Sequence, residues 1–384
     1  MDEKVALVPC ANYNKDKVDN ALAKALDCFG GLEKFVQPGQ RVLLKVNLLT
    51  KRPPEDAVTT HPAVVKAVVQ EVMRVGGQPL IYDSPGGPFT EASLQGIYDI
   101  SGLAQVATET GAKLNLDVAA SSVPAAEKAR VRNFTLSQAI ATADVIINLP
   151  KLKSHGLTRY TGAVKNLFGC IPGLQKAEYH LQLPVLEQFA DFLLDLALTV
   201  KPVLTIMDAV VAMEGEGPSA GTPRHLGYIL VSPSVFALDA VAVNMIGLKE
   251  TEVPTTRLAR ERCLLTSMVD DMVMGASLRE VAISDFVVPP PGGTSFRLLG
   301  HRLSPKLLKL AGRWLGARPV FQAEKCRRCG ICVRSCPAKA LTLNKKQPTV
   351  DLTKCIRCFC CQELCPAQAV IIHRPWLSRW LIKH

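Results

Sequence analysis

The sequence predicts an α/β domain with a largely parallel sheet flanked by helices, followed by a small C-terminal α+β domain. Three observations support this division of the 384 residues. Short apolar runs alternate with helical patterns over the first 290 residues, which is typical of a parallel sheet with helical crossovers. The run 289–293 reads PPPGG and breaks that pattern with an extended spacer. Beyond it, eight cysteines occur in two copies of one phrase, C-x2-C-x2-C-x3-C-P.

The strand and helix candidates of the large domain follow one another as βαβ units. Residues 42–46 form an apolar run that predicts a strand. Thr60 is a candidate N-cap for a helix that begins near Pro62 and ends at Gly76. The next strand is expected at 78–83, which closes one right-handed βαβ unit. Further candidates are strands at 112–118, 145–149, 203–207 and 226–231 and a helix at 236–246.

Polar side chains recur where these strands end. In open α/β sheets ligands bind outside the carboxyl ends of the strands, so the pattern predicts a polar pocket at that edge. Loops after strands are polar in most proteins, so each residue alone also has a plain structural interpretation. The candidate substrate-binding residues are Lys45, Asn47, Asp83, Lys151, Asn166 and Glu214.

The segment 151–155, KLKSH, carries the densest group of charges in this set. If the segment is extended, Lys151 and Lys153 point to the same side and present paired positive charge to an anionic ligand. His155 could move a proton near neutral pH. A further lysine, Lys165, follows a predicted helix start, and we take Lys153, His155 and Lys165 as the candidate catalytic residues. The glycine-rich acidic loop 213–218 would allow a ligand to approach the backbone, or it is a surface turn.

Each cysteine phrase has the spacing that wraps a cubane iron-sulfur cluster, with the last cysteine of each run binding the other cluster in two-cluster proteins. The predicted cofactors are therefore two [4Fe-4S] clusters. The expected ligands of the first cluster are Cys326, Cys329, Cys332 and Cys365. Those of the second are Cys355, Cys358, Cys361 and Cys336.

Other uses of the cysteines account for less of the pattern. A zinc site takes four ligands and would leave half of the eight thiols unexplained. Disulfides need an oxidising compartment, and the opening residues contain no visible signal peptide. Cys360 lies beside Cys361, so the spacing leaves open which neighbour binds metal. The remaining thiols lack ligand spacing and are expected to be buried structural cysteines: Cys10, Cys28, Cys170 and Cys263.

An internal repeat supports the two-cluster interpretation. Residues 325–343 align with residues 354–372, an offset of 29. Each half predicts a short strand, a cluster loop, a helical turn and a return strand, because such repeats usually reuse one structural unit. Residues 321–374 resemble the bacterial two-cluster ferredoxin fold.

A second resemblance covers residues 4–285. The ordered motifs KVN, THP, KLKSH, KNLFG, EGEGP and DAVA, which begin at 45, 60, 151, 165, 214 and 239, are similar to those of the domain of unknown function 362 family. Members often carry a C-terminal two-cluster ferredoxin module. The resemblance implies an iron-sulfur protein of anaerobic or redox metabolism, and it assigns no catalytic residue.

The predicted organisation has four parts: an α/β domain at 1–290, a basic amphipathic linker at 291–320, a ferredoxin-like domain at 321–374 and a basic tail at 375–384. The net charge of +11 is concentrated at 297–334, with ten Lys or Arg and one acid, Glu324. Trp314, Trp376 and Trp380 lie in the two basic segments. These segments are expected to pack the small domain onto the large one, meet an acidic redox partner, or contact a membrane peripherally. No nucleic-acid recognition module accompanies the charge.

These features predict an iron-sulfur electron-transfer protein or ferredoxin-linked oxidoreductase. Electrons would pass through two clusters to or from a small anionic substrate or a redox partner protein at the α/β domain. The alternative is a non-catalytic relay that docks an anionic metabolite or a larger redox enzyme. Neither G-x-G-x-x-G nor G-x4-G-K-[ST] occurs in a strand-to-helix position, so nucleotide cofactors have no support. No apolar run reaches bilayer length, and the expected location is the cytoplasm.

Overall fold

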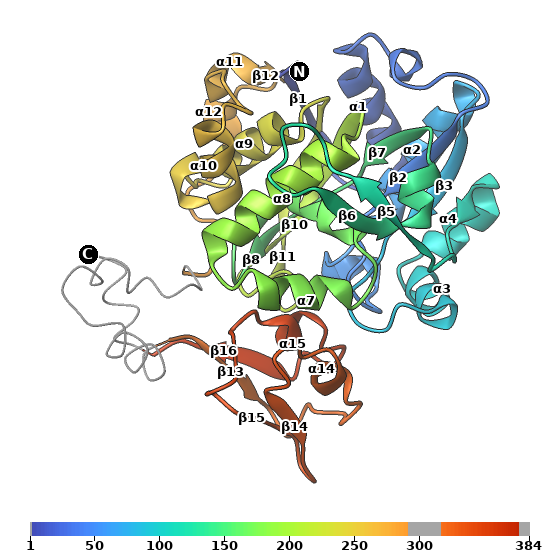
Figure 1. Cartoon of the computed structure of the whole chain (residues 1–384). Coiled ribbons are helices and arrows are strands. Elements are labelled where there is room, and N and C mark those ends of the chain that lie inside the picture. Colours follow the sequence, from blue (N-terminus) through green and yellow to red (C-terminus); the bar gives the residue numbers. More distant parts are fainter. Residues whose placement is uncertain (1, 291–315, 376–384) are drawn as a thin grey trace.

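The computed structural model describes residues 2–290 and 316–375, which form a large α/β domain and a small cysteine-rich module beneath it (Figure 1). Most of the linker predicted at 291–320 and the tryptophans Trp314, Trp376 and Trp380 lie outside the described residues. The module begins with a strand at Arg318, inside the range assigned above to the linker.

The large domain is built on a mixed, mostly parallel sheet of ten strands, in the order β12-β1-β11-β10-β7-β2-β3-β4, with β8 paired to β10 and β9 paired to β8. Parallel pairing joins β4, β3, β2, β7 and β10, whereas β11 runs antiparallel to both β10 and β1. The strands are β1 Val5–Pro9, β2 Arg41–Lys45, β3 Gln78–Tyr82, β4 Lys113–Leu114, β7 Val145–Asn148, β8 Lys151–His155, β9 Arg159–Thr161, β10 Leu204–Glu214, β11 Thr222–Ser232 and β12 Val273–Gly275.

The predicted strands at 42–46, 78–83, 145–149, 203–207 and 226–231 are all present. The prediction at 112–118 is reduced to the two residues of β4. The sequence interpretation missed β1 and did not identify 151–155 as the strand β8.

Helices cover both faces of the sheet (Figure 1), and a hairpin of β5 Ala120–Pro124 and β6 Asn133–Ser137 lies outside it. The helices are α1 Lys15–Asp27, α2 Pro62–Arg74, α3 Glu91–Ile100, α4 Leu103–Thr110, α5 Gln138–Thr142, α6 Ala163–Asn166, α7 Gln175–Gln182, α8 Leu186–Val200, α9 Val235–Met245, α10 Pro254–Glu261, α11 Val269–Met272 and α12 Leu278–Val281.

The start of α2 corrects one prediction. Pro62 occupies the first turn, where its missing N–H costs nothing. The cap is His61, whose Nδ1 accepts the N–H of Ala63 at 3.2 Å. Thr60 instead joins two strand ends: its hydroxyl donates to Leu149 O at 2.6 Å and accepts the Asn47 N–H at 2.9 Å. Thr60 therefore fixes the loop after β2 and does not cap the helix.

The short helix α6 is held by a carboxylate from α9. Asp239 accepts the N–H groups of Ala163 at 2.6 Å and Val164 at 2.9 Å, and the Tyr160 hydroxyl at 2.8 Å. Burial raises the pKa of Asp239 to about 6, against the lowering effect of these donors. A Cβ on Gly162 would collide with the Tyr160 hydroxyl, so only glycine fits this close approach. This arrangement fixes the direction of α6 and hence of the polar residues it carries.

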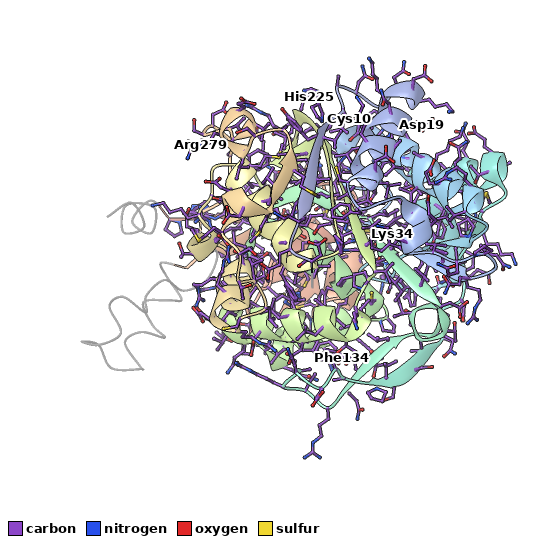
Figure 2. All side chains as sticks on the ribbon, turned by 90° about the horizontal axis from the view of Figure 1, so that it is seen from above. Cys10, Asp19, Lys34, Phe134, His225 and Arg279 are labelled. Carbon is purple, nitrogen blue, oxygen red and sulfur yellow. The ribbon has the colours of Figure 1, made fainter. Side chains whose placement is uncertain are left out.

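The scattered cysteines have two different environments. Cys10 and Cys170 are buried as expected, whereas Cys28 and Cys263 are exposed, which corrects the prediction for these two. Cys10 lies beside His225 at the edge of the α/β domain (Figure 2), where the Cys10 N–H donates to Gly227 O at 2.7 Å.

The module contains two antiparallel strand pairs and two helical turns, as the repeat predicts. The strands β13 Arg318–Phe321 and β16 Val370–His373 form one pair, and β14 Leu341–Leu343 and β15 Pro348–Val350 form the other. The turns are α14 Ile331–Arg334 and α15 Cys360–Glu363. The repeat extends to the backbone, because left-handed φ angles recur 29 residues apart at Arg328 and Arg357, Gly330 and Phe359, and Lys339 and Gln368.

The loop 215–221 of the α/β domain carries the module. Gln362 Nε2 donates to Glu216 O at 3.3 Å, and Gln368 Nε2 donates to Ser219 O at 3.1 Å. Arg374 and Glu216 form an ion pair at 2.5 Å. The loop predicted at 213–218 is therefore strand β10 up to Glu214 and a docking loop beyond it.

Candidate functional site

A cavity of about 100 Å³ lies where the carboxyl ends of β2 and β3, the strand β8 and the helices α6 and α7 meet the turn α15 of the module. Polar side chains from all of these elements line it. They are Asn47, Asp83, Ser84, Lys153, His155, Thr161, Lys165, Asn166, Lys176, His180, Cys360 and Glu363. The cavity thus includes six of the nine predicted catalytic and substrate-binding residues.

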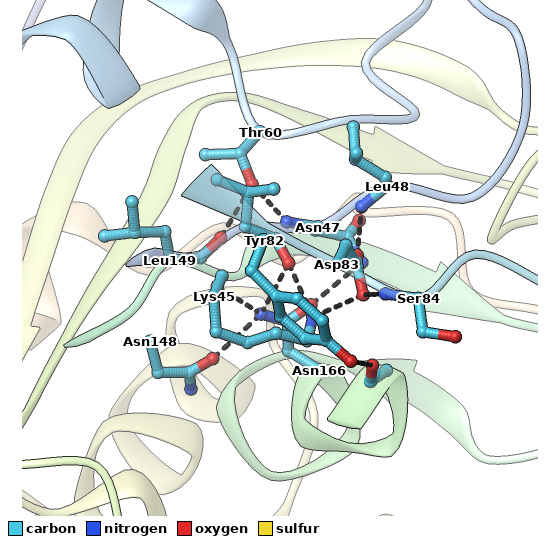
Figure 3. Close-up of polar contacts among 12 residues, drawn as sticks. Lys45, Asn47, Leu48, Thr60, Tyr82, Asp83, Ser84, Asn148, Leu149 and Asn166 are labelled. Atoms are coloured by element: carbon cyan, nitrogen blue, oxygen red, sulfur yellow. Dashed lines mark hydrogen bonds and ion pairs between the residues drawn. The ribbon is translucent and has the colours of Figure 1, made fainter. Parts of the chain in front are cut away.

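Lys45 and Asp83 form a buried ion pair beneath the cavity, at the ends of two adjacent strands (Figure 3). Lys45 Nζ lies 2.8 Å from Asp83 Oδ1 and donates to Val46 O at 2.6 Å. The other carboxylate oxygen of Asp83 accepts the N–H of Leu48 at 2.5 Å. Burial raises the pKa of Asp83, and Lys45 opposes that shift. Lys45 therefore supports Asp83 from behind and does not line the cavity itself.

Lys153 is held by the loop after β2. Its Nζ donates to Asn47 Oδ1 at 2.6 Å and to Val58 O at 2.9 Å. An ammonium has three N–H groups, so one is left for a ligand. Asn47 Nδ2 in turn donates to Asn166 Oδ1 at 3.0 Å, which ties β2 to α6 (Figure 3). Burial, with Lys165 nearby, lowers the pKa of Lys153 to about 7.

Two further lysines reach the cavity and differ in their partners. Lys176 Nζ donates to Ser84 O at 2.8 Å, Ser84 Oγ at 3.0 Å and Ile171 O at 2.7 Å, and burial lowers its pKa to about 7. Lys165 Nζ lies 5.6 Å from the centre of the Phe168 ring. Among the described residues no hydrogen bond engages Lys165 Nζ, so all its N–H groups remain for a ligand. Burial lowers the pKa of Lys165, while Glu363 opposes the shift.

His155 connects the α/β domain to the module. Its Nδ1 accepts the N–H of Leu157 at 3.0 Å, which places the ring proton on Nε2. Nε2 is buried without a well-formed hydrogen bond and lies 3.3 Å from Glu363 Oε1. Burial, together with Lys165 and His180, keeps the pKa of His155 well below its usual value. The imidazole is therefore a neutral donor rather than a group that titrates near neutral pH.

Besides Lys45, two more predicted residues lie outside the cavity. Lys151 Nζ forms a fully buried ion pair with Asp208 Oδ2 at 2.8 Å and donates to Tyr13 Oη at 2.7 Å. The Tyr13 ring stacks on His61 with centroids 3.5 Å apart. Glu214 accepts the N–H of Val287 at 3.0 Å on the far side of the docking loop. Both side chains hold strands and loops in place.

Six polar residues of the cavity are not among the nine candidates: Ser84, Thr161, Lys176, His180, Cys360 and Glu363. Lys176 and His180 lie on α7, which does not directly follow a strand of the main sheet. The position of Cys360 as a ninth cysteine in the cluster region was the one available signal. Glu363 comes from the module and reaches the cavity only because the two domains dock.

Two small hollows in the module are each lined by four of the eight phrase cysteines. The first is lined by Cys326, Cys329, Cys332 and Cys365, and the second by Cys336, Cys355, Cys358 and Cys361. In each hollow one thiol comes from the other phrase. Within residues 2–290 and 316–375 no three His, Cys, Asp or Glu side chains are close enough to hold a single metal ion. Thiols spread around a hollow fit a polynuclear cluster.

Comparison with known proteins finds a matching family model for each of the two domains. A model of the 4Fe-4S dicluster domain matches residues 318–366, and the module carries two [4Fe-4S] clusters. The model of the domain of unknown function DUF362 matches residues 42–244, more than half of the chain. The chain belongs to the DUF362 family. This DUF362 protein is 35% identical over 295 residues to a thylakoid-associated protein of Synechocystis sp., covering 75% of the chain and 88% of that relative.

Solved structures give a distant likeness. The lactate racemase apoprotein of Thermoanaerobacterium thermosaccharolyticum matches with a TM-score of 0.36 and 12% identity over 60% of the DUF362 protein. A protein of Thermotoga maritima matches with a TM-score of 0.32 and 13% identity over 55% of it. The DUF362 protein spans 55% and 53% of those two chains. Across its own described residues, it has no helix long and apolar enough to cross a membrane.

Proposed function

We propose that this DUF362 protein is an iron-sulfur oxidoreductase that exchanges electrons with a small anionic substrate bound between its two domains. One observation carries the proposal: Cys360 and Glu363, on either side of the proposed cluster ligand Cys361, line the same cavity as Lys153 and Lys165. A substrate held by these lysines would lie against the loop that wraps the second cluster. The cavity thus combines a cluster loop with buried cations.

The charges around the cavity favour an anion. Lys153, Lys165 and Lys176 face it with ammonium groups, and only Asp83 and Glu363 oppose them. Asp83 is already paired with Lys45, so the cavity keeps an excess of positive charge. Charge-assisted hydrogen bonds strengthen where water is excluded. The size of the cavity fits a small carboxylate or phosphate compound.

Three residues of the cavity would have different roles in the reaction. Lys165, with its free N–H groups, would bind the anionic group. The Nε2–H of His155 would donate to a substrate oxygen. Lys153, with a pKa of about 7, would give or take a proton near the reacting atom. With both [4Fe-4S] clusters bound, the module could supply two electrons, one from each cluster. A two-electron reduction of the substrate would then take one proton from Lys153 and one from solvent.

The ligand sets proposed for the clusters lead to a test of Cys360. In the repeat, Cys361 occupies the position of Cys332, and Cys360 that of Ile331, which is no ligand. We expect Cys360→Ala to retain about eight irons and eight sulfides per chain, two clusters of four. Cys361→Ala is expected to retain about four. Iron and sulfide analysis of the anaerobically reconstituted variants measures both contents. Loss of four irons in Cys360→Ala would show that Cys360, and not Cys361, binds the cluster.

Anion binding should weaken as the pH rises through about 7. Burial lowers the pKa of Lys153 and of Lys176 to about 7, so both are ammonium groups below that pH and neutral amines above it. Proton linkage then predicts a loss of affinity of up to about tenfold per pH unit for each lysine that a bound anion needs charged. Calorimetric titration with sulfate, whose charge stays constant, at pH 6 and pH 8 tests this. The same affinity for sulfate at pH 6 and at pH 8 would contradict this prediction.

A relay without catalysis is the alternative. In that case the cavity would hold a metabolite, or serve a larger redox enzyme, while the clusters only conduct. Purification without oxygen and mass spectrometry of what stays bound would identify the ligand. Reduced protein would then be mixed with that compound. Substrate-dependent reoxidation supports the oxidoreductase, whereas lasting reduction with fast transfer to a protein acceptor supports the relay.

We also propose that the protein is cytoplasmic and contacts a membrane surface. The relative from Synechocystis sp. is named as thylakoid-associated. The basic segments 291–320 and 375–384 contain tryptophan next to lysine and arginine, a composition suited to the headgroup region. Vesicle co-sedimentation of the full chain and of a chain that ends at residue 375 would test the tail.

A further inference from the structure

We propose that the surface around the first cluster is the docking site of an acidic electron-carrier protein, which exchanges single electrons with that cluster. The inference uses the two clusters but does not depend on the chemistry proposed for the cavity. It rests on three independent features: the charge of the two repeat halves, the exposure of the first hollow, and the direction in which the second half faces.

The two halves of the module share a ligand phrase but differ in charge. Residues 325–350 contain seven Lys or Arg and no acid. In residues 351–373, Lys354 and Arg357 are balanced by Asp351 and Glu363. Both halves have the same ligand spacing, so cluster binding does not require the positive charge of the first half. The charge therefore has another use.

The positive groups surround the more accessible of the two hollows. Cys329 is exposed, whereas every cysteine of the second hollow is at least partly buried. Arg327 and Arg328 line the first hollow themselves, and Arg328 is exposed. Arg334 donates to Cys329 O at 3.1 Å. A partner that approaches Cys329 therefore meets guanidinium groups on the cluster loop and on the turn that follows it.

The hairpin of β14 and β15 extends this surface. Pro348 lines the first hollow, and the exposed Lys345 and Lys346 lie in the turn just before it. Leu343 is 39% exposed, and its Cδ2 lies 4.0 Å from where a Cβ on Gly330 would be. The hairpin lies at the end of the module away from the α/β domain (Figure 1), so the described part of that domain does not cover it. A small apolar spot inside a cationic rim is typical of transient protein interfaces.

The second half faces the other way. Cys360 and Glu363 line the cavity, and Leu364 packs against Gly86 of the α/β domain. The cavity wall contains these residues of the second cluster loop and none of residues 325–350, so electrons would enter at the first cluster and leave from the second. The exchange moves one electron from a reduced carrier to the first cluster, with no bond made or broken and no proton transferred.

The chemistry of this surface selects a protein partner. Residues 325–350 contain no aromatic side chain on which a base could stack or which could enter a headgroup layer. The cations instead frame an exposed cluster ligand. Steering by opposite charge speeds protein encounter by about tenfold to a thousandfold at low salt, and an acidic one-electron carrier uses that gain directly.

Charge reversal at the hairpin tests the inference. The intact holoprotein is mixed by stopped flow with reduced flavodoxin, an acidic carrier, and cluster reduction is followed by visible absorbance. Lys345→Glu combined with Lys346→Glu is expected to slow reduction at least about tenfold at low salt. Glu324→Lys, which removes the acid that precedes Lys325, is expected to speed it. Reduction by dithionite and the iron content should stay unchanged in all variants.

The matched control carries the same change of charge elsewhere. Lys17 and Lys24 are exposed on α1 of the α/β domain, and the variant with both changed to glutamate should retain the wild-type rate with flavodoxin. An equal loss in this control would show that net charge alone is responsible and would overturn the docking site. Unchanged rates in the hairpin variant, combined with lost binding to phosphatidylglycerol vesicles, would overturn it in favour of a membrane surface.

Discussion

Replacing Lys153 with methionine is expected to weaken anion binding and substrate turnover by about a hundredfold. Lys153 is fully buried at the cavity and has one N–H left after its bonds to Asn47 and Val58. Removing a preorganised donor from a site that excludes water typically costs ~10²- to 10³-fold in rate. Methionine keeps most of the length of the side chain but removes both the charge and the proton.

The measurements distinguish an effect on the cavity from an effect on the clusters. Visible absorbance and iron content of Lys153→Met should match the wild type, because Lys153 does not line either cysteine hollow. Sulfate titration and substrate-dependent reoxidation should both be impaired, and His155→Gln should impair turnover as well. Lys24→Met, at an exposed position on α1, serves as the control. Full activity in both cavity variants would end the proposal of a catalytic cavity.

Replacing Lys151 with methionine is expected to destabilise the α/β domain by about 3 to 5 kcal/mol, the usual cost of leaving a buried charge without its partner. Lys151 and Asp208 are both fully buried, and Lys151 also donates to Tyr13. Asp208 would keep its hydrogen bonds from Tyr13 and the His61 N–H but lose its cation. The effect should therefore appear in stability and leave the geometry of the cavity unchanged.

A double substitution distinguishes this structural role from a role in binding. Lys151→Met with Asp208→Asn removes both charges, so the loss should be smaller than the sum of the single losses. Urea unfolding followed by far-ultraviolet circular dichroism gives the midpoints. A Lys151→Met protein with wild-type stability but no sulfate binding would instead make Lys151 a ligand residue, as the sequence pattern suggested.

Local patterns made much of the fold and part of the site predictable. Parallel strands place their carboxyl ends at one edge, so the order of strands and polar residues along the chain was enough to group Asn47 with Asp83, whereas Asn166 lies on the helix α6. The cysteine spacing is equally local, and its two phrases sit on a backbone that repeats every 29 residues. Alternation within β8 predicts Lys151 and Lys153 on the same side of the strand, but only Lys153 lines the cavity.

The remaining features depend on contacts that no local pattern contains. Which of the two lysines reaches the cavity is decided by Asp208 on the neighbouring strand β10, which binds Lys151 and leaves Lys153 to the loop after β2. The antiparallel placement of β11 between β1 and β10 likewise depends on the whole sheet. Glu363 is separated from His155 by about half of the chain, and only domain docking brings the two within 3.3 Å.

The turn α15 is part of both the second cluster loop and the wall of the cavity. It lies between Cys358 and Cys365 in the cluster loops, and its Cys360 and Glu363 close the cavity. A chain synthesised under iron starvation would consequently lack more than its electron carriers, because the segment that shapes the binding site would have no metal to fold around. Ligand binding would then require that the clusters are inserted first. The two domains would also have to occur together in one chain rather than be exchanged as independent modules.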